Sequence, residues 1–439
     1  MPRTRQIACL AGAASTALLL AVPAHAAEAP AINTGDTAWV LTSAALVLLM
    51  TAPGLALFYG GMVRRKNVLA VLMQSFILAA LVSVQWVLFG YSLAFSPGSA
   101  LIGSLHWIGL RAVSASQPYP DYAATIPHQA YMVFQCMFAV ITPALITGAF
   151  AERISFKGFL VFSLLWMTLI YDPLAHWVWG VDGWLHKLGA LDFAGGTVVH
   201  ISAGFAGLAA ALVIGRRVDH KQGQLMEANN VPFVLLGAAL LWFGWFGFNA
   251  GSALAASPLS LSAFVTTNTA AAAAALTWMT LSWAENKKPS AMATATGAVC
   301  GLVAITPASG FVGPVASMAI GLIAGVVTYL MVLFRNKKTR IDDTLDVWGA
   351  HGMGGVVGAI LTGVFAEKLI NSAGNNGLLF GNPGQLLTQI LAVAATATYA
   401  FIMTLLILKG LSIFGLRVSK EEEIQGLDLA VHGEEGYRL

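Results

Sequence analysis

Eleven apolar stretches follow one another along the chain, and they constrain its fold more than any other feature of the sequence. A helix of about 20 residues crosses a hydrocarbon core of about 30 Å, and each stretch is long enough for that. Backbone amide and carbonyl groups cannot stay unpaired in lipid, so stretches of this length are expected to be helices. We place these helices at 38–62, 68–95, 128–150, 158–180, 193–215, 231–252, 259–283, 291–307, 312–334, 347–366 and 386–411.

The composition leads to the same conclusion. Of the 439 residues, 57% are hydrophobic and only 10% are charged, whereas soluble domains carry about 25% charged residues. A chain of this length with so few charges cannot cover a water-facing surface, so lipid must serve as its solvent. The three cysteines, Cys9, Cys136 and Cys300, lie in apolar surroundings and suggest neither a disulfide framework nor a metal site. We therefore expect an all-α polytopic membrane protein.

Basic residues concentrate in alternate connections between the predicted helices. One set holds Arg64, Arg65, Lys66, Arg153, Lys157, Arg216, Arg217, Lys221, Lys287, Lys288, the basic residues of 335–340, Arg417 and Lys420. The other set holds only Arg111, Lys187 and Lys368. Because cytoplasmic loops carry the excess of Lys and Arg, the first set and the C-terminal tail are expected in the cytoplasm. An odd number of spans then places the N-terminus on the outside.

The first 26 residues have the pattern of a secretory signal peptide. Arg3 and Arg5 precede the apolar stretch 7–22, and Ala24 and Ala26 flank an A-x-A-like cleavage site. The alternative is a first helix that is retained, but the apolar stretch is short and Pro23 ends it. We expect a signal peptide at 1–26, a membrane domain at 27–415 and a cytoplasmic tail at 416–439. This arrangement indicates a bacterial inner membrane protein with a periplasmic N-terminus.

Small residues and the helix count indicate how the helices pack. Glycines such as Gly204, Gly207, Gly321 and Gly325 let helix backbones approach closely in lipid. The odd count suggests two inverted five-helix repeats plus a final helix, an arrangement that places a transport path between the repeats. No G-x-x-x-x-G-K-[ST] loop is present for direct coupling to ATP. Neither a metal motif nor a basic and aromatic surface for nucleic acid is found.

Two histidines lie inside predicted spans, His200 eight residues after Asp192 and His351 five residues after Asp346. Ionisable residues at that depth are costly and usually face a cavity or a partner. Either histidine alone could be a neutral core residue bonded to a backbone carbonyl. Two of them, each flanked by small residues and preceded by an aspartate, favour a shared pore site. Desolvation is expected to keep both rings neutral, so that they can pass a small polar molecule or a proton.

Aromatic side chains and a hydroxyl gather near the predicted outer ends of three helices: Phe134, Phe138, Trp179, Trp245, Phe246, Phe248 and Ser252. Any one of them is explained by packing or by the aromatic belt at the membrane interface. Together they could hold a small cation by cation–π attraction, worth about 0.5–2 kcal/mol. That is far less than the cost of moving an intact ion through hydrocarbon. Such a cation would have to lose its charge, which ammonium can do and potassium cannot.

The segments that carry these residues resemble the ammonium transporter family (Amt/Mep/Rh), and most closely its bacterial AmtB type. They are GLALFYGGMVRRK (54–66), GAFAERIS (148–155), AHWVWG (175–180), DFAGGTVVH (192–200), GWFGFNAGS (244–252) and HGMGG (351–355). The resemblance covers nearly the whole mature chain. It implies eleven helices related by a pseudo-two-fold axis, a homotrimer with one pore per subunit, and transport without a cofactor or enzymatic chemistry.

The resemblance also implies a role for individual residues. It assigns Trp179, Phe138 and Ser252 to an outer ammonium-binding site, Asp192 to its buried support, Phe138 and Phe248 with Phe134 to a gate, Trp245 to the pore lining, and His200 and His351 to the twin pore histidines. Cys136 and Met137 beside Phe138 depart from the family pattern, and Asp172 has no role that we can assign.

The expected function is a channel-like ammonium transporter that binds ammonium outside, removes its proton near Phe138 and Trp179, and conducts ammonia past the histidines. Whether the proton crosses separately is open. A Rh-like neutral gas channel is one alternative and an ammonium sensor is another; an intramembrane enzyme is the least expected, since no nucleophile or metal set accompanies the histidines.

The tail after Arg417 contains Glu421, Glu422 and Glu423. Its charge alone predicts a solvated acidic end, whereas the resemblance implies that it helps to dock a PII-type signalling trimer. A chain without 417–439 is then expected to transport but not to bind PII.

Overall fold

A computed structural model describes residues 32–223 and 227–437, and all of the regular elements in these residues are helical. The α-helices are α1 (Thr34–Leu49), α2 (Ala56–Met62), α3 (Val68–Gln85), α4 (Tyr91–Phe95), α5 (His128–Phe150), α6 (Phe156–Trp166), α7 (Asp172–Trp179), α8 (Trp184–Leu188), α9 (Ser202–Ile214), α10 (Val218–Lys221), α11 (Val231–Gly251), α12 (Pro258–Asn286), α13 (Ala291–Ile305), α14 (Pro314–Lys338), α15 (Met353–Phe365), α16 (Pro383–Ser412) and α17 (Lys420–Gln425). The predicted signal peptide, 1–26, lies outside the described residues.

Ten helices of the described chain are long and apolar enough to cross a membrane, and the shorter apolar helix α13 makes an eleventh span. In chain order the spans are α1–α2, α3–α4, α5, α6–α7, α9, α11, α12, α13, α14, α15 and α16. The predicted ends agree with these helices to within about four residues. The eleven predicted spans are therefore confirmed. The predicted ends differ from the observed helix ends by a few residues, as is usual for helix boundaries.

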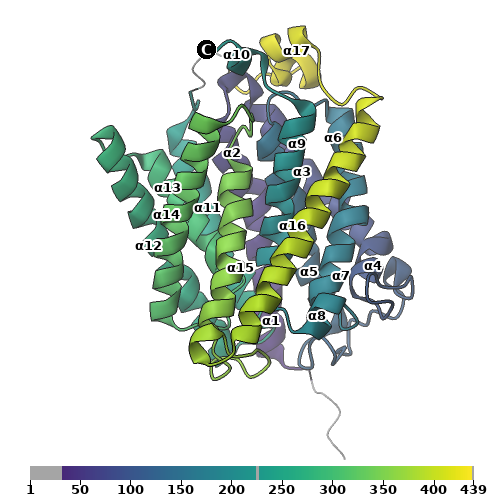
Figure 1. Ribbon diagram of the computed structural model, residues 1–439. Helices are drawn as coiled ribbons and strands as arrows, with labels where there is room; N and C mark the ends of the chain where they lie inside the picture. The colour runs from purple at the N-terminus through teal and green to yellow at the C-terminus, as the bar shows by residue number, and fades with distance from the viewer. Residues whose placement is uncertain (1–31, 224–226, 438–439) are drawn as a thin grey trace, which may run out of the picture.

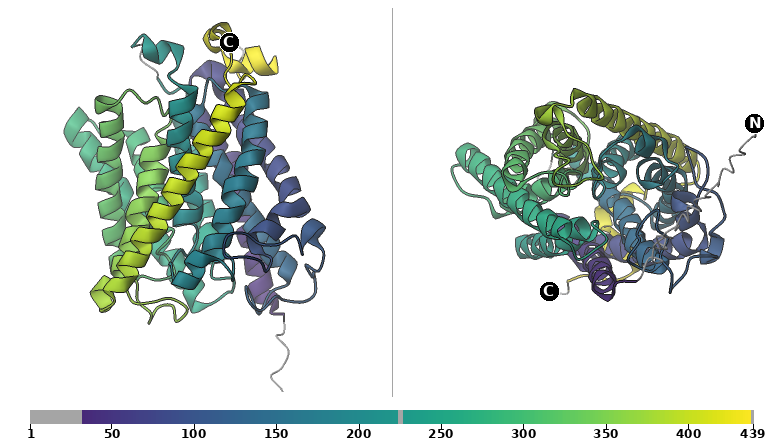
Figure 2. Two further views of the ribbon diagram at one scale, coloured as in Figure 1. Left: turned by 45° about the vertical axis from the view of Figure 1, so that its right-hand side comes forward. Right: turned by 90° about the horizontal axis from the view of Figure 1, so that it is seen from below.

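The helices form one bundle whose two ends differ (Figure 1). The short helices α10 and α17 lie at one end, and α8 and the start of α1 lie at the other. The first described residues and the tail are thus on opposite sides, as an odd number of spans requires. Seen along the bundle in Figure 2, α12 to α15 form one group and the earlier spans form another. The final helix α16 runs diagonally and packs against α9, α15 and α6, which joins both groups.

Five spans contain a π-helical turn, in which one extra residue is inserted into the helix. These turns are Met50–Leu55, Trp86–Gly90, Met167–Tyr171, Gly196–Ile201 and Trp348–Gly352. The first contains Pro53 and the third ends just before Pro173, residues that lack the amide hydrogen of a regular helix. The last two contain His200 and His351 and open the fifth and tenth spans. This equivalent placement in two halves fits the predicted five-helix repeats.

Two glycines let the fifth and tenth spans touch backbone to backbone. A Cβ atom on Gly204 of α9 would lie 2.1 Å from the amide nitrogen of Gly352 and 2.2 Å from its Cα atom. A Cβ atom on Gly355 would lie 2.9 Å from the carbonyl oxygen of Gly196. In lipid, helices associate through such close packing rather than through the hydrophobic effect. The crossing brings His200 and His351 side by side.

Asp172, which had no assignable role, connects the second and fourth spans. Gln85 of α3 donates a hydrogen bond of 2.7 Å from Nε2 to Asp172 Oδ2 at the start of α7, and both side chains are buried. A polar pair inside an apolar bundle orients two helices that sequence periodicity alone does not orient. We therefore assign Asp172 to helix packing rather than to the transport path.

The alternative prediction, a solvated acidic tail, is wrong for two of the tail's carboxylates, whereas Glu421, Glu434 and Glu435 are exposed. Asp428 accepts hydrogen bonds from the backbone amides of Leu69 and Ala70, 3.0 and 2.8 Å long, at the start of α3. Glu423 accepts a 2.6 Å bond from the amide of Val218, which begins α10. Both carboxylates are buried, and each caps a helix N-terminus, where negative charge is stabilising.

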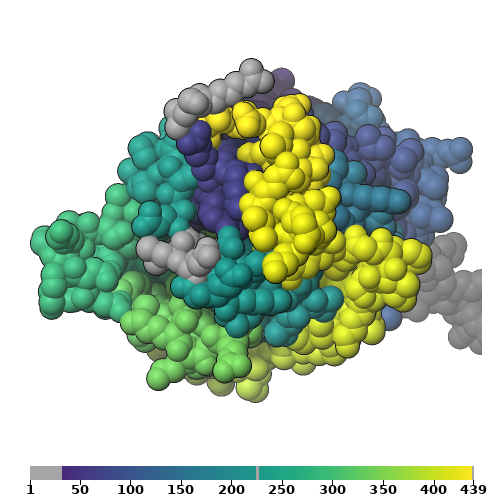
Figure 3. Space-filling model, turned by 90° about the horizontal axis from the view of Figure 1, so that it is seen from above, coloured from purple at the N-terminus to yellow at the C-terminus, as the bar shows by residue number. Residues whose placement is uncertain are grey.

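The docked tail also borders a hollow at this end of the bundle. Figure 3 shows the tail in yellow beside an opening whose floor is formed by early residues in purple. The cavity there has a volume of about 440 Å³. It is lined by Arg64, Arg65, Lys66, Gln425, Asp428, Leu429, Glu435, Gly436 and Tyr437.

Replacing Gly204 by alanine tests the crossing of the two spans. The added methyl group has no room against Gly352, so Gly204→Ala is expected to destabilise the folded protein by about 1–3 kcal/mol. Thermal unfolding of the purified protein in detergent measures the effect. Gly410→Ala in α16 is the matched control, because no atom lies within 4 Å of the added Cβ. Equal unfolding temperatures for the two variants would contradict the proposed contact.

Candidate functional site

The outer-site residues predicted from the sequence meet in one cavity at the end of the bundle opposite the tail. Its volume is about 200 Å³. The lining consists of Asp121, Tyr122, Tyr131, Phe134, Gln135, Phe138, Trp179, Val181, His186, Phe193, Ser252 and Leu254. Phe134, Phe138, Trp179 and Ser252 were expected at this position, and they come from three different spans. Sequence reasoning missed Asp121, Tyr131, Gln135 and His186, which lie on loops and helix faces without a periodic signal.

A stacked pair of rings closes the inner side of this cavity. The ring centroids of Phe138 and Phe248 are 4.1 Å apart, with an angle of 27° between the planes. Phe138 also meets the ring of Trp179 edge to face at 5.9 Å and the ring of Phe134 at 5.0 Å. Both stacked rings are buried. The expected juxtaposition of Phe138 and Phe248 is therefore present, whereas Phe246 stacks on Phe264 at 3.8 Å and does not line this cavity.

Behind the stack, the two histidines face each other. Their Nδ1 atoms are 3.4 Å apart, and the ring planes are inclined by 22°. His200 is 1% exposed and His351 3% exposed. Trp245, the predicted pore-lining tryptophan, stacks on His200 at 5.4 Å. A contact between two Nδ1 atoms is a hydrogen bond only if one ring carries a proton there and the other does not.

The rings form a continuous row through the bundle. Phe248 lies 6.0 Å from His200, between the ring centroids, and the two planes are nearly parallel. The order is thus Phe138, Phe248, His200 and His351, leading from the outer cavity toward the tail side. His200 Nε2 is buried and has no hydrogen-bond partner in the part of the chain that the structure describes. The row presents apolar ring faces and a few imidazole nitrogens.

Asp192 holds the start of the span that carries His200. Its Oδ1 atom accepts from the amides of Gly195 and Gly196 at 2.9 and 2.6 Å, and its Oδ2 atom accepts from the amides of Thr197 and Val198 at 2.8 and 3.2 Å and from the Thr197 hydroxyl. Its backbone carbonyl accepts a 2.9 Å bond from Trp179 Nε1. Asp192 therefore supports both a ring of the outer cavity and the helix of His200. It does not itself line the cavity.

The corresponding cap of the tenth span is Asp343, which sequence reasoning missed. Asp343 accepts bonds of 3.1 and 2.8 Å from the amides of Val347 and Trp348. Asp346, singled out from the sequence, instead pairs with Arg335. Asp343 precedes His351 by eight residues, the same spacing as between Asp192 and His200. That shared spacing is the signal that could have identified it.

Two adjoining cavities lead from His351 toward the tail side. The first, of about 210 Å³, is lined by Phe58, Tyr59, Met62, Ala228, Met292, Thr296, Val299, Thr344, Leu345, Asp346, Ala350 and His351. The second, of about 250 Å³, shares four of these residues and adds Arg64, Glu152, Arg217, His220, Glu227, Arg335, Asn336 and Asp342. The row of rings thus ends at cavities whose lining becomes charged toward the tail side.

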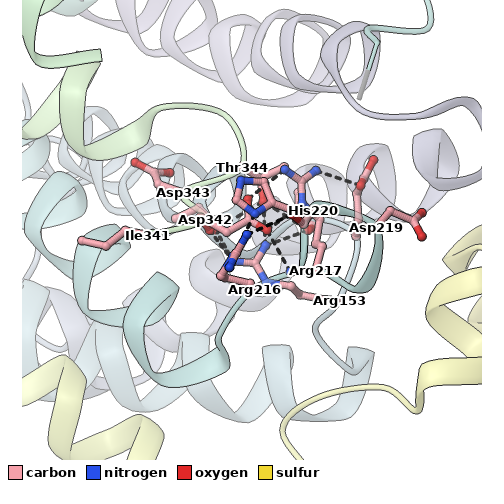
Figure 4. Close-up of polar contacts among 12 residues, drawn as sticks. Arg153, Arg216, Arg217, Asp219, His220, Ile341, Asp342, Asp343 and Thr344 are labelled. Carbon is pink, nitrogen blue, oxygen red and sulfur yellow. Dashed lines mark hydrogen bonds and ion pairs between the residues drawn. The ribbon is translucent and has the colours of Figure 1, made fainter. Parts of the chain in front are cut away.

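The wall of the charged chamber is a network of paired ions (Figure 4). Arg217 contacts Glu152 at 2.9 Å and Asp342 at 2.8 Å, and Arg153 donates to Thr344 Oγ1 at 2.6 Å. Burial opposes ionisation of Glu152, but the nearby guanidinium groups of Arg217 and Arg64 outweigh it and lower its pKa. Hydrogen bonds from Arg217 likewise lower the pKa of Asp342 despite its burial. Both carboxylates therefore remain charged at neutral pH and paired with Arg217.

Comparisons with known proteins give matches that cover nearly the whole chain. The model of the Ammonium Transporter Family matches residues 38–437. An ammonium transporter of Bacillus subtilis is 53% identical over 405 residues, which are 92% of this chain and 98% of that protein. The ammonium transporter Amt1 of Archaeoglobus fulgidus is 47% identical over 408 residues, 92% of this chain and 100% of that protein.

Solved structures show the same fold. The crystal structure of Candida albicans Mep2 has a TM-score of 0.83 at 36% identity, covering 89% of this chain and 88% of that one. A structure titled Sensor Amt Protein has a TM-score of 0.83 at 32% identity, covering 90% of this chain and 98% of that one.

Removing the Asp192 carboxylate tests its role as the cap of the His200 span. Asp192→Ala leaves several buried amides without an acceptor, at about 1–3 kcal/mol each, so we expect a loss of at least about 3 kcal/mol in stability. Thermal unfolding in detergent measures it. Asp182→Ala is the control, because the exposed Asp182 carboxylate contacts Lys187 and one loop amide. Similar unfolding temperatures for the two variants would rule out the capping role.

Proposed function

The chain belongs to the ammonium transporter family, and from this premise we propose that it carries ammonium nitrogen across a membrane along the row of rings between the outer cavity and the charged chamber. The observation that supports this path most directly is the buried sequence Phe138, Phe248, His200 and His351. It connects a cavity on one side with chambers on the other. A row of apolar rings lets a small neutral molecule pass at far lower cost than an ion.

In this proposal, ammonium first binds in the outer cavity. The faces of Phe138 and Trp179 attract the cation, at about 0.5–2 kcal/mol for a cation–π contact. The Ser252 hydroxyl donates a 2.9 Å bond to the carbonyl of Phe248, which leaves its oxygen free to accept from an N–H group of ammonium. These contacts hold the cation where the Phe138–Phe248 stack blocks its further movement. The proton is lost before the nitrogen passes the stack.

Neutral ammonia then passes the histidines. When one Nδ1 atom carries a proton and donates it to the other, the two rings have opposite tautomers. One Nε2 atom then offers a lone pair and the other offers an N–H group. Ammonia both donates and accepts hydrogen bonds, so each ring can contact it without a charged intermediate. The released proton either stays outside or crosses by a separate route through the histidines or water.

We also propose a homotrimer in a bacterial inner membrane, with the first residues periplasmic and the tail cytoplasmic. The resemblance to the bacterial AmtB type supports the trimer, and the bacterial relatives support the compartment. The concentration of basic residues in the connections on the tail side supports the orientation.

For the tail, we propose that it helps to dock a PII-type signalling protein. Deletion of 417–439, the test suggested by the sequence, is not suitable for this proposal. Deleting 417–439 would remove Glu423 and Asp428, which cap α10 and α3. Such a deletion is therefore expected to disturb the bundle. A chain without 417–439 is then expected to lose transport as well as PII binding. Exposed apolar residues of the docked tail are better targets, since Ile424 is 50% exposed and Leu429 is 46% exposed.

Replacing both histidines tests the conduction path. His200→Leu with His351→Leu is expected to reduce ammonium-evoked currents or methylammonium uptake in proteoliposomes by more than tenfold, because the row loses all of its imidazole nitrogens. His106→Leu, a change at an exposed outer histidine, is the control and should leave the currents unchanged. Full current in the double variant would contradict the path.

The same recordings distinguish the proposed ammonium transporter from a neutral gas channel. An ammonium gradient that alters internal pH without any current would favour a neutral gas channel over an electrogenic transporter. A current that follows the ammonium gradient would favour transport of a net charge.

Changing the exposed tail residues tests the signalling partner. Ile424→Asp with Leu429→Asp places two charges in an apolar contact and is expected to weaken binding of a purified PII protein by at least about tenfold. Surface plasmon resonance measures binding, and liposome currents should be unchanged. Binding of equal strength in the natural and doubly changed proteins would exclude these residues from the docking surface.

A further inference from the structure

One polar side chain of the final helix is completely buried beside the fifth and tenth spans. Gln389 of α16 is 0% exposed and is not among the residues that line the outer cavity or the cavities beyond His351. Its Oε1 atom accepts hydrogen bonds from the amide of Leu191 at 2.7 Å and from Gln385 Nε2 at 3.2 Å. Its Nε2 atom donates to the carbonyls of Leu191 at 2.8 Å and Ala359 at 3.1 Å. These contacts fix the orientation of the amide, because a turned amide would place N–H against N–H.

The peptide that Gln389 holds lies where no helix supports it. Residues 189–195 fall between the end of α8 and the π turn that contains His200, so their backbone groups need partners outside a helix. The amide and the carbonyl of Leu191 both pair with Gln389. Two bonds to one residue fix both the position and the direction of its peptide, whereas a single bond would leave the peptide free to rotate.

This peptide determines the place of the next residue, Asp192. The Asp192 carboxylate caps the span of His200, and the Asp192 carbonyl accepts the 2.9 Å bond from Trp179 Nε1. A ring of the outer cavity and the start of the fifth span are therefore both attached to the residue directly after Leu191. A shift of the Leu191 peptide moves both of them.

The other backbone partner of Gln389 belongs to the tenth span. Ala359 lies on α15, about two turns after His351. The helices α15 and α16 come close at this level, since a Cβ atom on Gly363 would lie 2.9 Å from Gln389 Cγ. One amide thus joins the backbone that precedes the His200 span to the backbone of the His351 span.

We propose that Gln389 is a positioning residue of the transport path. It holds the peptide before Asp192 against the tenth span. In this way it sets the place of the Trp179 ring in the outer cavity and aligns the two pore histidines. The inference rests on the proposed transport function and deepens it, because it names a residue that acts on the path without contacting the transported molecule. Such a residue affects how tightly the cation binds and how fast the nitrogen crosses, and not fold stability alone.

The decisive variant is Gln389→Met, which keeps the length of the side chain but removes its hydrogen bonds. The full-length protein is reconstituted in liposomes, and ammonium-evoked current or methylammonium uptake is measured over a range of concentrations. The half-saturating concentration is expected to rise at least about threefold, because the Trp179 ring loses its alignment with the cation. The maximal rate is also expected to fall, as the two histidines lose their alignment. A smaller number of folded molecules would lower the maximal rate alone.

Two further variants exclude a merely structural effect. Thr404→Val is the matched control on the same helix, because it removes the buried 3.1 Å bond from Trp166 Nε1 and should leave the half-saturating concentration unchanged. Gln389→Glu tests the hydrogen bonds themselves. A buried carboxyl that faces carbonyl oxygens stays neutral, and it then has one donor and one acceptor for Leu191. Its half-saturating concentration should lie within twofold of the natural value.

A rise of less than threefold in Gln389→Met would overturn the inference, as would an equal rise in Thr404→Val. Equal values for Gln389→Met and Gln389→Glu would also overturn it, because side-chain volume would then matter and hydrogen bonding would not. If Gln389→Met does not fold, Gln389→Asn takes its place, since its shorter side chain cannot reach both Leu191 and Ala359. The same rise is then expected, and its absence is equally decisive. A natural protein without any saturable response to ammonium would instead refute the proposed function.

Discussion

The backbone contact between Gly204 and Gly352 is the constraint on which the rest of the path depends. It permits the fifth and tenth spans to cross at a distance that any side chain at Gly204 would prevent. Only at that distance can His200 and His351 share a hydrogen bond between their Nδ1 atoms. Each span begins with a π turn that contains its histidine.

Buried carboxylates stabilise this arrangement at its ends. Asp192 and Asp343 each sit eight residues before a pore histidine and accept the amides that begin its span. Asp428 of the tail does the same for α3. Free amides at a helix start are costly inside a membrane, and a carboxylate satisfies several of them at once while matching the helix dipole. These three carboxylates therefore cap the starts of helices, and the row from Phe138 to His351 contains no acidic residue.

In the proposed function, selection of the transported molecule follows from the contrast between the cavity and the row behind it. The outer cavity offers ring faces and a hydroxyl, which favour a small cation with N–H donors. The row from Phe138 to His351 offers rings and neutral imidazole nitrogens, which favour a molecule without charge. Ammonium satisfies the first environment and ammonia the second, and they differ by one proton. Ions such as potassium fit only the first, because they cannot lose their charge.

The sequence by itself determined the eleven spans and the odd topology, because lipid demands long apolar helices. It also predicted residues that the fold brings together in the outer cavity and in the row of rings, although their roles in transport remain a proposal. It did not distinguish Asp343 from Asp346 as the cap of the tenth span, nor show that Phe246 stacks on Phe264 away from the cavity. It also left open whether the tail docks, and it missed Gln135. These spans are apolar on the faces toward lipid and on the faces toward protein alike, so periodicity does not mark the inner face. Which side chains meet is decided by how the helices cross, and only the tertiary structure contains that information.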